Sequence, residues 1–228
     1  MIQLHYYPGN ANLIPHILLR ELALPFELVK VDRDHGAHRG AAYLALNPNG
    51  TIPVLVDGEL VLYETAAICM HLADRALADL APGGRSDQAL APALGTPERA
   101  HYYKWMAWMT NTLQAMLIHY FYPDRMVAAG NAAGAEEVKQ AAQARIGELL
   151  EQLERQLASH GEPWLLGARY TALDPYAFVL CRWTRGFSGP AAAPARTRPL
   201  LGAYLQRMLA RPAVQAAIEA EGLQPPLV

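Results

Sequence analysis

Residues 47–68 read NPNGTIPVLVDGELVLYETAAI, and this stretch decides the fold. Two short apolar runs, VLV and LVL, flank the dipeptide Asp57-Gly58, which is typical of a tight hairpin turn. The first four residues, Asn-Pro-Asn-Gly, are strong turn formers that end the segment before the hairpin. From residue 64 to about residue 75, apolar side chains recur at helical spacing. The stretch therefore predicts a turn, an antiparallel hairpin and a helix in succession.

Upstream of this stretch, the chain predicts a strand, a helix, a second strand and a short helix. Alternating apolar side chains mark a strand over residues 2–7, and Asn12 is a suitable N-cap for the helix that follows. The remaining segments are a strand over 26–31, a loop over 32–40 and a short helix over 41–46. The order βαβα followed by ββα predicts a mixed sheet covered by helices.

Downstream of Pro97, nearly every segment is predicted to be helix or loop. Residues 80–96 are rich in Ala, Pro and Gly and lack periodicity, which is typical of a linker. Thr171 and Asp174 have the spacing of a capping box, with Tyr170 as its hydrophobic staple. Helices are predicted over 98–122, 136–157, 174–185 and 198–209, and from Pro212 onward. We expect an α/β domain over 1–78, a linker over 79–97 and an all-helical domain over 98–228.

Composition and charge exclude several classes of protein. A formal net charge of −2 over 228 residues gives no general attraction to nucleic acid or to an anionic membrane. Cys69 and Cys181 lie far apart in apolar stretches, which predicts buried free thiols, and the absence of CxxC excludes a thioredoxin-type dithiol exchanger. His35 and His38 have no further ligands at matching spacing, so no metal site is predicted. Without a signal segment or an apolar run near ~18 residues, a cytoplasmic location is expected.

Two segments of the α/β half carry groups suited to an anionic or thiol ligand. The strand ending near Tyr6 and the helix beginning near Asn12 direct backbone N–H groups and a positive helix end toward one edge of the sheet. Tyr6, Tyr7, Asn10 and Asn12 are donors near that edge. Glu64 and Thr65 begin another helix, where they suit an ammonium and a carboxylate, although a simple helix cap is the alternative.

Pro53 directly precedes a strand, where its missing N–H is unusual. If the Ile52–Pro53 bond is cis, the backbone N–H and C=O of Ile52 face outward and are able to pair with an extended peptide. An ordinary trans-proline at a strand start is the alternative. The residues alone leave both interpretations open.

In this order, the motifs resemble those of the cytosolic glutathione transferases, and the bacterial beta-like group in particular. Residues 6–21, YYPGNANLIPHILLRE, resemble the group's first strand and helix, and residues 47–55 resemble its cis-proline turn. Residues 167–174 resemble the capping motif of its helical half. The resemblance extends over about residues 1–222. It implies a thioredoxin-like domain that binds glutathione, an all-helical domain that binds the electrophile, and a homodimer.

The resemblance also implies roles for individual residues. Ile52 would pair through its backbone with the cysteinyl unit of glutathione, next to a cis Pro53, while Glu64 and Thr65 would bind the γ-glutamyl group. Where beta-like enzymes carry a cysteine, this chain has Ala11, which excludes a mixed disulfide with glutathione at that position.

The thiolate of glutathione must then be stabilised by hydrogen bonds and by the helix end. A free thiol has a pKa near 8.5, and each unit of lowering needs about 1.4 kcal/mol. We expect Asn12 to donate to the sulfur while its carbonyl oxygen caps the helix by accepting from the Ile14 N–H. Tyr6 is the rival donor, and Asn10 lies nearby.

The predicted function is that of a glutathione transferase acting on a small hydrophobic electrophile. The first long helix offers side chains to hold it: Met106, Thr110, Asn111, Gln114 and Phe121, with Tyr176 or Trp183 as a further wall. Two alternatives remain, which are a transferase-fold protein that binds without turnover and a glutathione-dependent disulfide reductase or isomerase.

Overall fold

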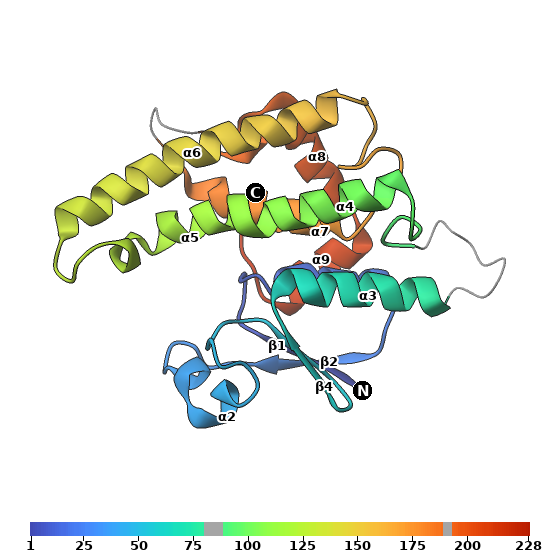
Figure 1. Ribbon diagram of the computed structural model, residues 1–228, viewed down its shortest axis with the longest axis horizontal. Coiled ribbons are helices and arrows are strands. Elements are labelled where there is room, and N and C mark those ends of the chain that lie inside the picture. Colours follow the sequence, from blue (N-terminus) through green and yellow to red (C-terminus); the bar gives the residue numbers. More distant parts are fainter. Residues whose placement is uncertain (80–88, 189–192) are drawn as a thin grey trace. The chain divides into compact units, whose positions relative to one another are not determined.

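The computed structural model describes residues 1–79, 89–188 and 193–228 (Figure 1). They form two compact units, each with its own core. The first comprises Met1–Pro92 and Leu209–Gln224, and the second comprises Ala93–Met208 and Pro225–Val228. Part of the linker predicted over 79–97 lies outside the described residues.

The first unit contains the predicted mixed sheet. Its strands are β1 (Ile2–Tyr6), β2 (Phe26–Lys30), β3 (Val54–Asp57) and β4 (Leu60–Tyr63), in the spatial order β2-β1-β3-β4. β1 is parallel to β2, while β3 is antiparallel to both β1 and β4. The helices are α1 (Leu13–Glu21), α2 (Ala41–Leu44), α3 (Thr65–Asp79) and α9 (Pro212–Ala220), with a 3-10 turn, η1 (Ala37–Arg39). The predicted element order of the α/β half is confirmed.

α1 lies at the centre of this unit. Every residue from Leu13 to Leu19 is buried, because α1 packs against both α3 and α9. α9 contributes Val214, Ala217 and Ile218 to this core. The last helix therefore belongs with the sheet, whereas the predicted division placed it in the helical domain.

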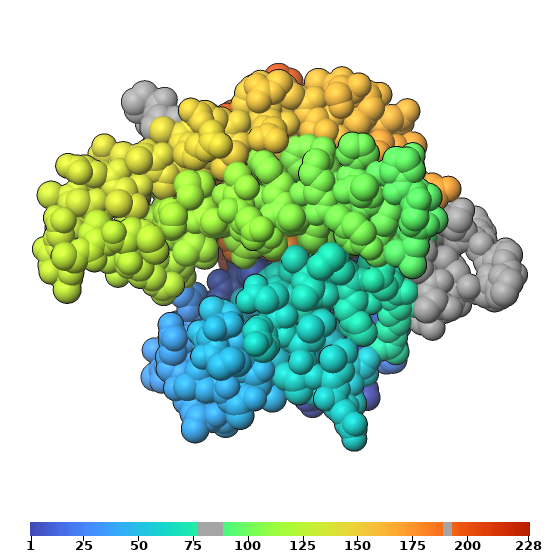
Figure 2. Space-filling model, viewed as in Figure 1, coloured from blue at the N-terminus to red at the C-terminus, as the bar shows by residue number. Residues whose placement is uncertain are grey.

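The second unit is helical. Its helices are α4 (Pro97–Trp108), α5 (Ala115–Phe121), α6 (Ala132–Ala158), α7 (Leu173–Trp183) and α8 (Pro199–Leu209). Short turns η4 (Pro123–Met126), η5 (Thr184–Gly186) and η6 (Ala195–Thr197) connect them. α5 packs along α6 (Figure 2), and α7 is buried from Leu173 to Arg182. One predicted helix, 98–122, is divided here into α4, a π-helical turn η3 (Met109–Gln114) and α5.

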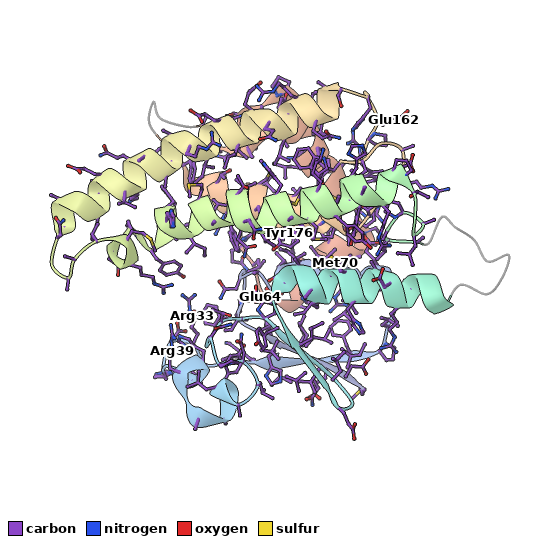
Figure 3. All side chains as sticks on the ribbon, viewed as in Figure 1. Arg33, Arg39, Glu64, Met70, Glu162 and Tyr176 are labelled. Carbon is purple, nitrogen blue, oxygen red and sulfur yellow. The ribbon has the colours of Figure 1, made fainter. Side chains whose placement is uncertain are left out.

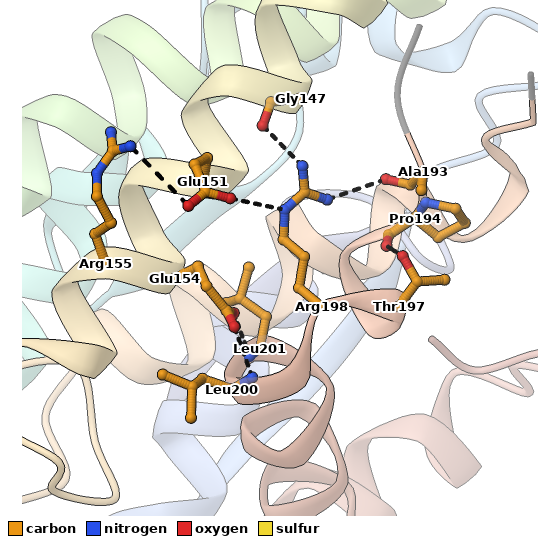
Figure 4. Close-up of polar contacts among 10 residues, drawn as sticks. All are labelled: Gly147, Glu151, Glu154, Arg155, Ala193, Pro194, Thr197, Arg198, Leu200 and Leu201. Atoms are coloured by element: carbon orange, nitrogen blue, oxygen red, sulfur yellow. Dashed lines mark hydrogen bonds and ion pairs between the residues drawn. The ribbon is translucent and has the colours of Figure 1, made fainter. Parts of the chain in front are cut away.

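A carboxylate of α6 caps the beginning of α8 (Figure 4). The backbone N–H groups of Leu200 and Leu201 donate to the two oxygens of Glu154, each at 2.8 Å. Arg198 extends the connection by donating to the carbonyl of Gly147 at 2.8 Å. Negative charge at a helix N-terminus is stabilising, so this contact fixes α8 on α6.

The capping box at the start of α7 is built around Asp174. The N–H of Thr171 donates to Asp174 Oδ2 at 2.7 Å, as a capping box requires. The Thr171 hydroxyl accepts from the N–H of Leu173 at 3.3 Å, because the helix begins at that residue. Leu165 N–H and the Tyr204 hydroxyl donate to Asp174 Oδ1 at 3.0 and 3.1 Å, and the Thr171 hydroxyl donates to Oδ2 at 3.3 Å. The Asp174 half of the predicted box is confirmed, whereas the N-cap residue is Ala172 rather than Thr171. Asp174 also joins α7 to α8.

Both cysteines are buried free thiols, as predicted. Burial raises the pKa of Cys181 to about 12 and raises that of Cys69 further still. Within the three described segments, no helix combines the length and apolarity needed to cross a membrane.

Candidate active site

The sheet register brings three predicted site segments together at one edge. His5 pairs with Val54, and Val54 pairs with Tyr63. Tyr6 and Glu64, which follow His5 and Tyr63, and Pro53, which precedes Val54, therefore lie at the same edge of the sheet. Because β1 and β4 run in the same direction, α1 and α3 both begin at this edge. Two positive helix ends and their unpaired N–H groups thus favour an anion there.

The turn before β3 offers a free backbone segment. The Ile52–Pro53 bond is cis, as the resemblance implied. Neither the N–H nor the C=O of Ile52 bonds to another group in the described part of the chain. Tyr43 Oη and Asn47 Nδ2 both donate to the carbonyl of Thr51 at 2.8 Å, which holds the turn in place. Ile52 is thereby presented for pairing with an extended peptide.

The start of α3 carries the predicted acid and hydroxyl. Glu64 has φ of 70°, a left-handed conformation that is uncommon for a residue other than glycine. Its side chain is exposed (Figure 3), and its carbonyl accepts from the N–H of Ile68 at 3.0 Å. Thr65, the first residue of the helix, is nearly buried. Backbone strain of this kind is concentrated at ligand-binding positions, which makes both residues site candidates.

Asn12 does not make the predicted cap. Its backbone is already helical, with φ of −58° and ψ of −24°, whereas a side-chain cap needs an extended backbone. Its Oδ1 accepts from the N–H of Tyr7 at 3.1 Å, and its Nδ2 donates to Glu221 Oε1 at 2.9 Å. The side chain is 0% exposed. The amide thus fixes the loop between β1 and α1, and its predicted contact with sulfur finds no support in this geometry.

Glu221, which follows α9, holds the loop between β1 and α1 in place, and the sequence did not reveal it. Its buried carboxylate accepts from Gly9 N–H at 2.8 Å and from Asn12 and His16, each at 2.9 Å. His16 Nε2 accepts from Arg20 Nε at 2.9 Å, so the imidazole proton lies on Nδ1 and is donated to Glu221. More than 200 residues separate Glu221 from Asn12, and no local pattern connects them.

The remaining donors at the N-terminus of α1 are backbone groups and the side chains of Tyr6 and Asn10. The N–H groups of Ala11 and Asn12 have no acceptor among the described residues, and neither the Tyr6 hydroxyl nor the Asn10 side chain has a partner there. Tyr7 is different, because its hydroxyl donates to Asp34 at 2.7 Å, which raises its pKa. The donors that this geometry leaves available to a thiolate are therefore the two N–H groups, the Tyr6 hydroxyl and the Asn10 amide.

Two arginines between β2 and α2 extend this edge, and sequence reasoning missed them (Figure 3). The guanidinium of Arg33 lies 5.5 Å from the centroid of the Tyr7 ring. Gly50 has φ of 59°, and a Cβ there would lie 3.2 Å from Arg39 Cδ. The turn that leads to Ile52 is therefore packed directly against Arg39, whose side chain is exposed.

The predicted electrophile residues differ in exposure. Met106 is only 2% exposed and belongs to the core of the helical unit, so it offers no surface to a substrate. Phe121 is 44% exposed and makes an edge-on contact with Trp183, with centroids 6.3 Å apart. Tyr176 is fully buried, so it does not form a wall of an electrophile pocket. The other three side chains lie on η3 and are at least partly exposed to solvent: Thr110, Asn111 and Gln114.

Comparison with known proteins decides the family. The family model "Glutathione S-transferase, N-terminal domain" matches residues 14–75, and "Glutathione S-transferase, C-terminal domain" matches residues 119–221. The chain is 31% identical over 227 residues to glutathione S-transferase GstA of Escherichia coli, covering 98% of this chain and 100% of that protein. The chain belongs to the glutathione S-transferase family.

Two further family members bear on function. A Sphingomonad glutathione S-transferase solved in complex with glutathione is 30% identical, with a TM-score of 0.78 over 97% of this chain and 100% of that chain. Disulfide-bond oxidoreductase YfcG of Escherichia coli is 28% identical over 226 residues, covering 90% of this chain and 94% of that protein. The relatives thus carry the names of two activities, glutathione S-transferase and disulfide-bond oxidoreductase.

Proposed function

We propose that this protein is a glutathione transferase, with glutathione as co-substrate and a small hydrophobic electrophile as second substrate. The observation that carries the proposal is the sheet edge where the free backbone of Ile52, the pair Glu64 and Thr65, and the α1 N-terminus come together. Family membership and the glutathione-bound relative support the same conclusion.

Each part of glutathione has a matching group at this edge. The cysteinyl unit pairs with the backbone of Ile52, and the γ-glutamyl carboxylate meets Thr65 and the first N–H groups of α3. Glu64 meets the ammonium. Arg39, exposed beside the turn, is the group of opposite charge for the glycyl carboxylate. The sulfur is then directed toward the tip of α1.

At that tip, the N–H groups of Ala11 and Asn12 and the hydroxyl of Tyr6 stabilise the thiolate. Donors and helix dipole at ~0.5–1 kcal/mol each lower the thiol pKa by about one to two units. The thiolate forms a bond to the electrophilic carbon, the bond to the leaving group breaks, and the thiol proton passes to solvent. Asn12 acts here through its backbone N–H and by holding the loop.

A glutathione-dependent disulfide reductase is the second candidate, favoured by the similarity to YfcG. Because both protein cysteines are buried, the attacking thiolate in that reaction would also be that of glutathione. A binding protein without turnover is the third candidate, suggested by Ala11 at the cysteine position.

Conjugation of a chloroaromatic compound at saturating glutathione tests the transferase proposal. Glutathione binding without conjugation would favour the binding protein instead. Turnover of a small disulfide without conjugation would favour the disulfide reductase.

Replacement of Thr65 by Val is expected to weaken glutathione binding at least about tenfold, because a hydrogen bond to a carboxylate contributes about 1.5–3 kcal/mol. Calorimetric titration with glutathione measures the change. Thr65→Ser keeps the hydroxyl and serves as the control, with affinity within about twofold of wild type. Equal affinities for the Val variant and wild type would remove Thr65 from the site.

The cytoplasmic location and the homodimer stay predictions of the sequence and of the family resemblance. No nucleic-acid or membrane partner is proposed, given the net charge of −2.

A further inference from the structure

A cleft of about 480 Å³ lies where the C-terminal end of α1 meets the beginning of α9. Both helices belong to the first unit, so the cleft is formed within that unit alone. The candidate active site lies at the other end of α1, and the two sites share no side chain. The walls of the cleft are mostly apolar and include Leu24, Phe26, Pro212 and Ala216. Two charged side chains, Arg20 and Glu21, also line it.

The guanidinium of Arg20 is held in a fixed orientation. Its Nε donates to His16 Nε2 at 2.9 Å, and His16 is itself fully buried and bonded to Glu221. The guanidinium carbon also lies 5.5 Å from the centroid of the Phe26 ring. These contacts engage Nε and one face of the group. The two Nη groups have no acceptor among the residues that the structure describes, so they are available to a ligand.

No neighbouring group neutralises the charge of Arg20 in the described part of the chain. The carboxylate of Glu21 is engaged by Arg211, whose Nε and Nη2 donate to its two oxygens at 2.6 and 2.8 Å. The last carbonyls of α1 accept hydrogen bonds from the N–H groups of residues 22–24. The cleft therefore combines one uncompensated positive charge with apolar walls.

We propose that this cleft binds a small carboxylic acid with an apolar tail, such as a short aliphatic acid. The two Nη groups of Arg20 match the two oxygens of a carboxylate, and such bidentate pairs are among the stronger hydrogen-bonded contacts. The tail packs against Leu24, Phe26 and Ala216, where it is removed from water. An oriented polar group within apolar walls is typical of small-molecule sites.

The test compares hexanoate with hexanamide, which has the same tail and no charge, by ligand-observed nuclear magnetic resonance titration. Wild-type protein is expected to bind hexanoate in the millimolar range and hexanamide at least about tenfold more weakly. Arg20→Gln removes the charge and is expected to weaken hexanoate binding at least about tenfold, with hexanamide changed less than about twofold. Arg155→Gln, at an exposed position on α6, controls for the loss of a positive charge.

A second variant, Ala216→Phe, tests the location of the site. It fills the cleft but leaves Arg20 and its bond to His16 in place, and it is expected to weaken hexanoate binding about tenfold. If Arg20→Gln does not fold, this variant decides alone.

Three results would overturn the inference. The first is no binding of hexanoate in the millimolar range, and the second is equal affinity of the wild-type protein for hexanoate and hexanamide. The third is unchanged affinity for hexanoate in Ala216→Phe, which would place the ligand elsewhere.

Discussion

Replacement of Glu221 by Gln is expected to lower the free energy of unfolding by about 3 kcal/mol or more. The carboxylate accepts hydrogen bonds from Gly9 N–H, Asn12 Nδ2 and His16 Nδ1, and the side chains of Glu221 and His16 are fully buried. A Gln side chain offers one acceptor oxygen and places its own NH₂ against these donors. Buried donors left without a partner are costly.

The same change is expected to weaken glutathione binding, because the loop from Tyr7 to Asn12 carries the N–H groups proposed for the sulfur. Urea-induced unfolding and calorimetric titration with glutathione measure the two effects. Glu219→Gln is the matched control, since Glu219 lies two residues away and is exposed. Its expected change is below about 0.5 kcal/mol. Equal stability of the two variants would show that the buried carboxylate does not hold the loop.

The second large effect is expected for Asp174→Asn, at about 3 kcal/mol of stability. The carboxylate accepts from Leu165 N–H, from Thr171 N–H and from Tyr204 Oη. An Asn amide at this position directs its NH₂ group toward at least one of these donors. Because Asp174 joins the capping box to α8, its loss weakens the helical unit as a whole.

This effect is also expected to depend on pH. Burial raises the pKa of Asp174 to about 6, against the opposing influence of its hydrogen bonds. The folded pKa lies above the ~3.9 of an unfolded aspartate, so the folded protein binds the proton more tightly. The contribution of Asp174 to stability therefore falls as the pH rises from about 4 to about 6.

The stability difference between wild type and Asp174→Asn is thus expected to be larger at about pH 4.5 than at about pH 7.5. Urea-induced unfolding at both pH values measures it. Asp124→Asn, at an exposed position, is the control and should show no such trend. A difference that grows with rising pH would contradict the assignment of the raised pKa to Asp174.

Local patterns predicted most of the fold. The Asp57-Gly58 hairpin, the turn formers before it and the Thr171-Asp174 box each depend on residues within a few positions of one another. Turns and helix caps can be predicted from the sequence, because their geometry depends on residues within a few positions of one another. The residues Ile52, Glu64 and Thr65 were found in the same way.

Contacts between residues far apart in the sequence explain why the placement of α9 and the role of Glu221 were not predicted. α9 packs on α1, and Glu221 reaches Asn12, although about 200 residues lie between them. Because the sequence does not show the contact with Glu221, Asn12 was predicted to be an ordinary N-cap. The π turn η3 was missed because its apolar residues, Met109 and Leu113, keep a spacing compatible with an α-helix.

The central claim is that the sulfur of glutathione becomes anionic at the tip of α1 without help from a protein thiol. Ultraviolet absorbance of the thiolate, followed against pH in the complex with glutathione, tests it most directly. Burial raises the pKa of both Cys69 and Cys181, so the protein's own thiols do not titrate in this range. Bound glutathione is predicted to titrate about one to two units below the ~8.5 of a free thiol. Titration at the pKa of free glutathione would contradict the account.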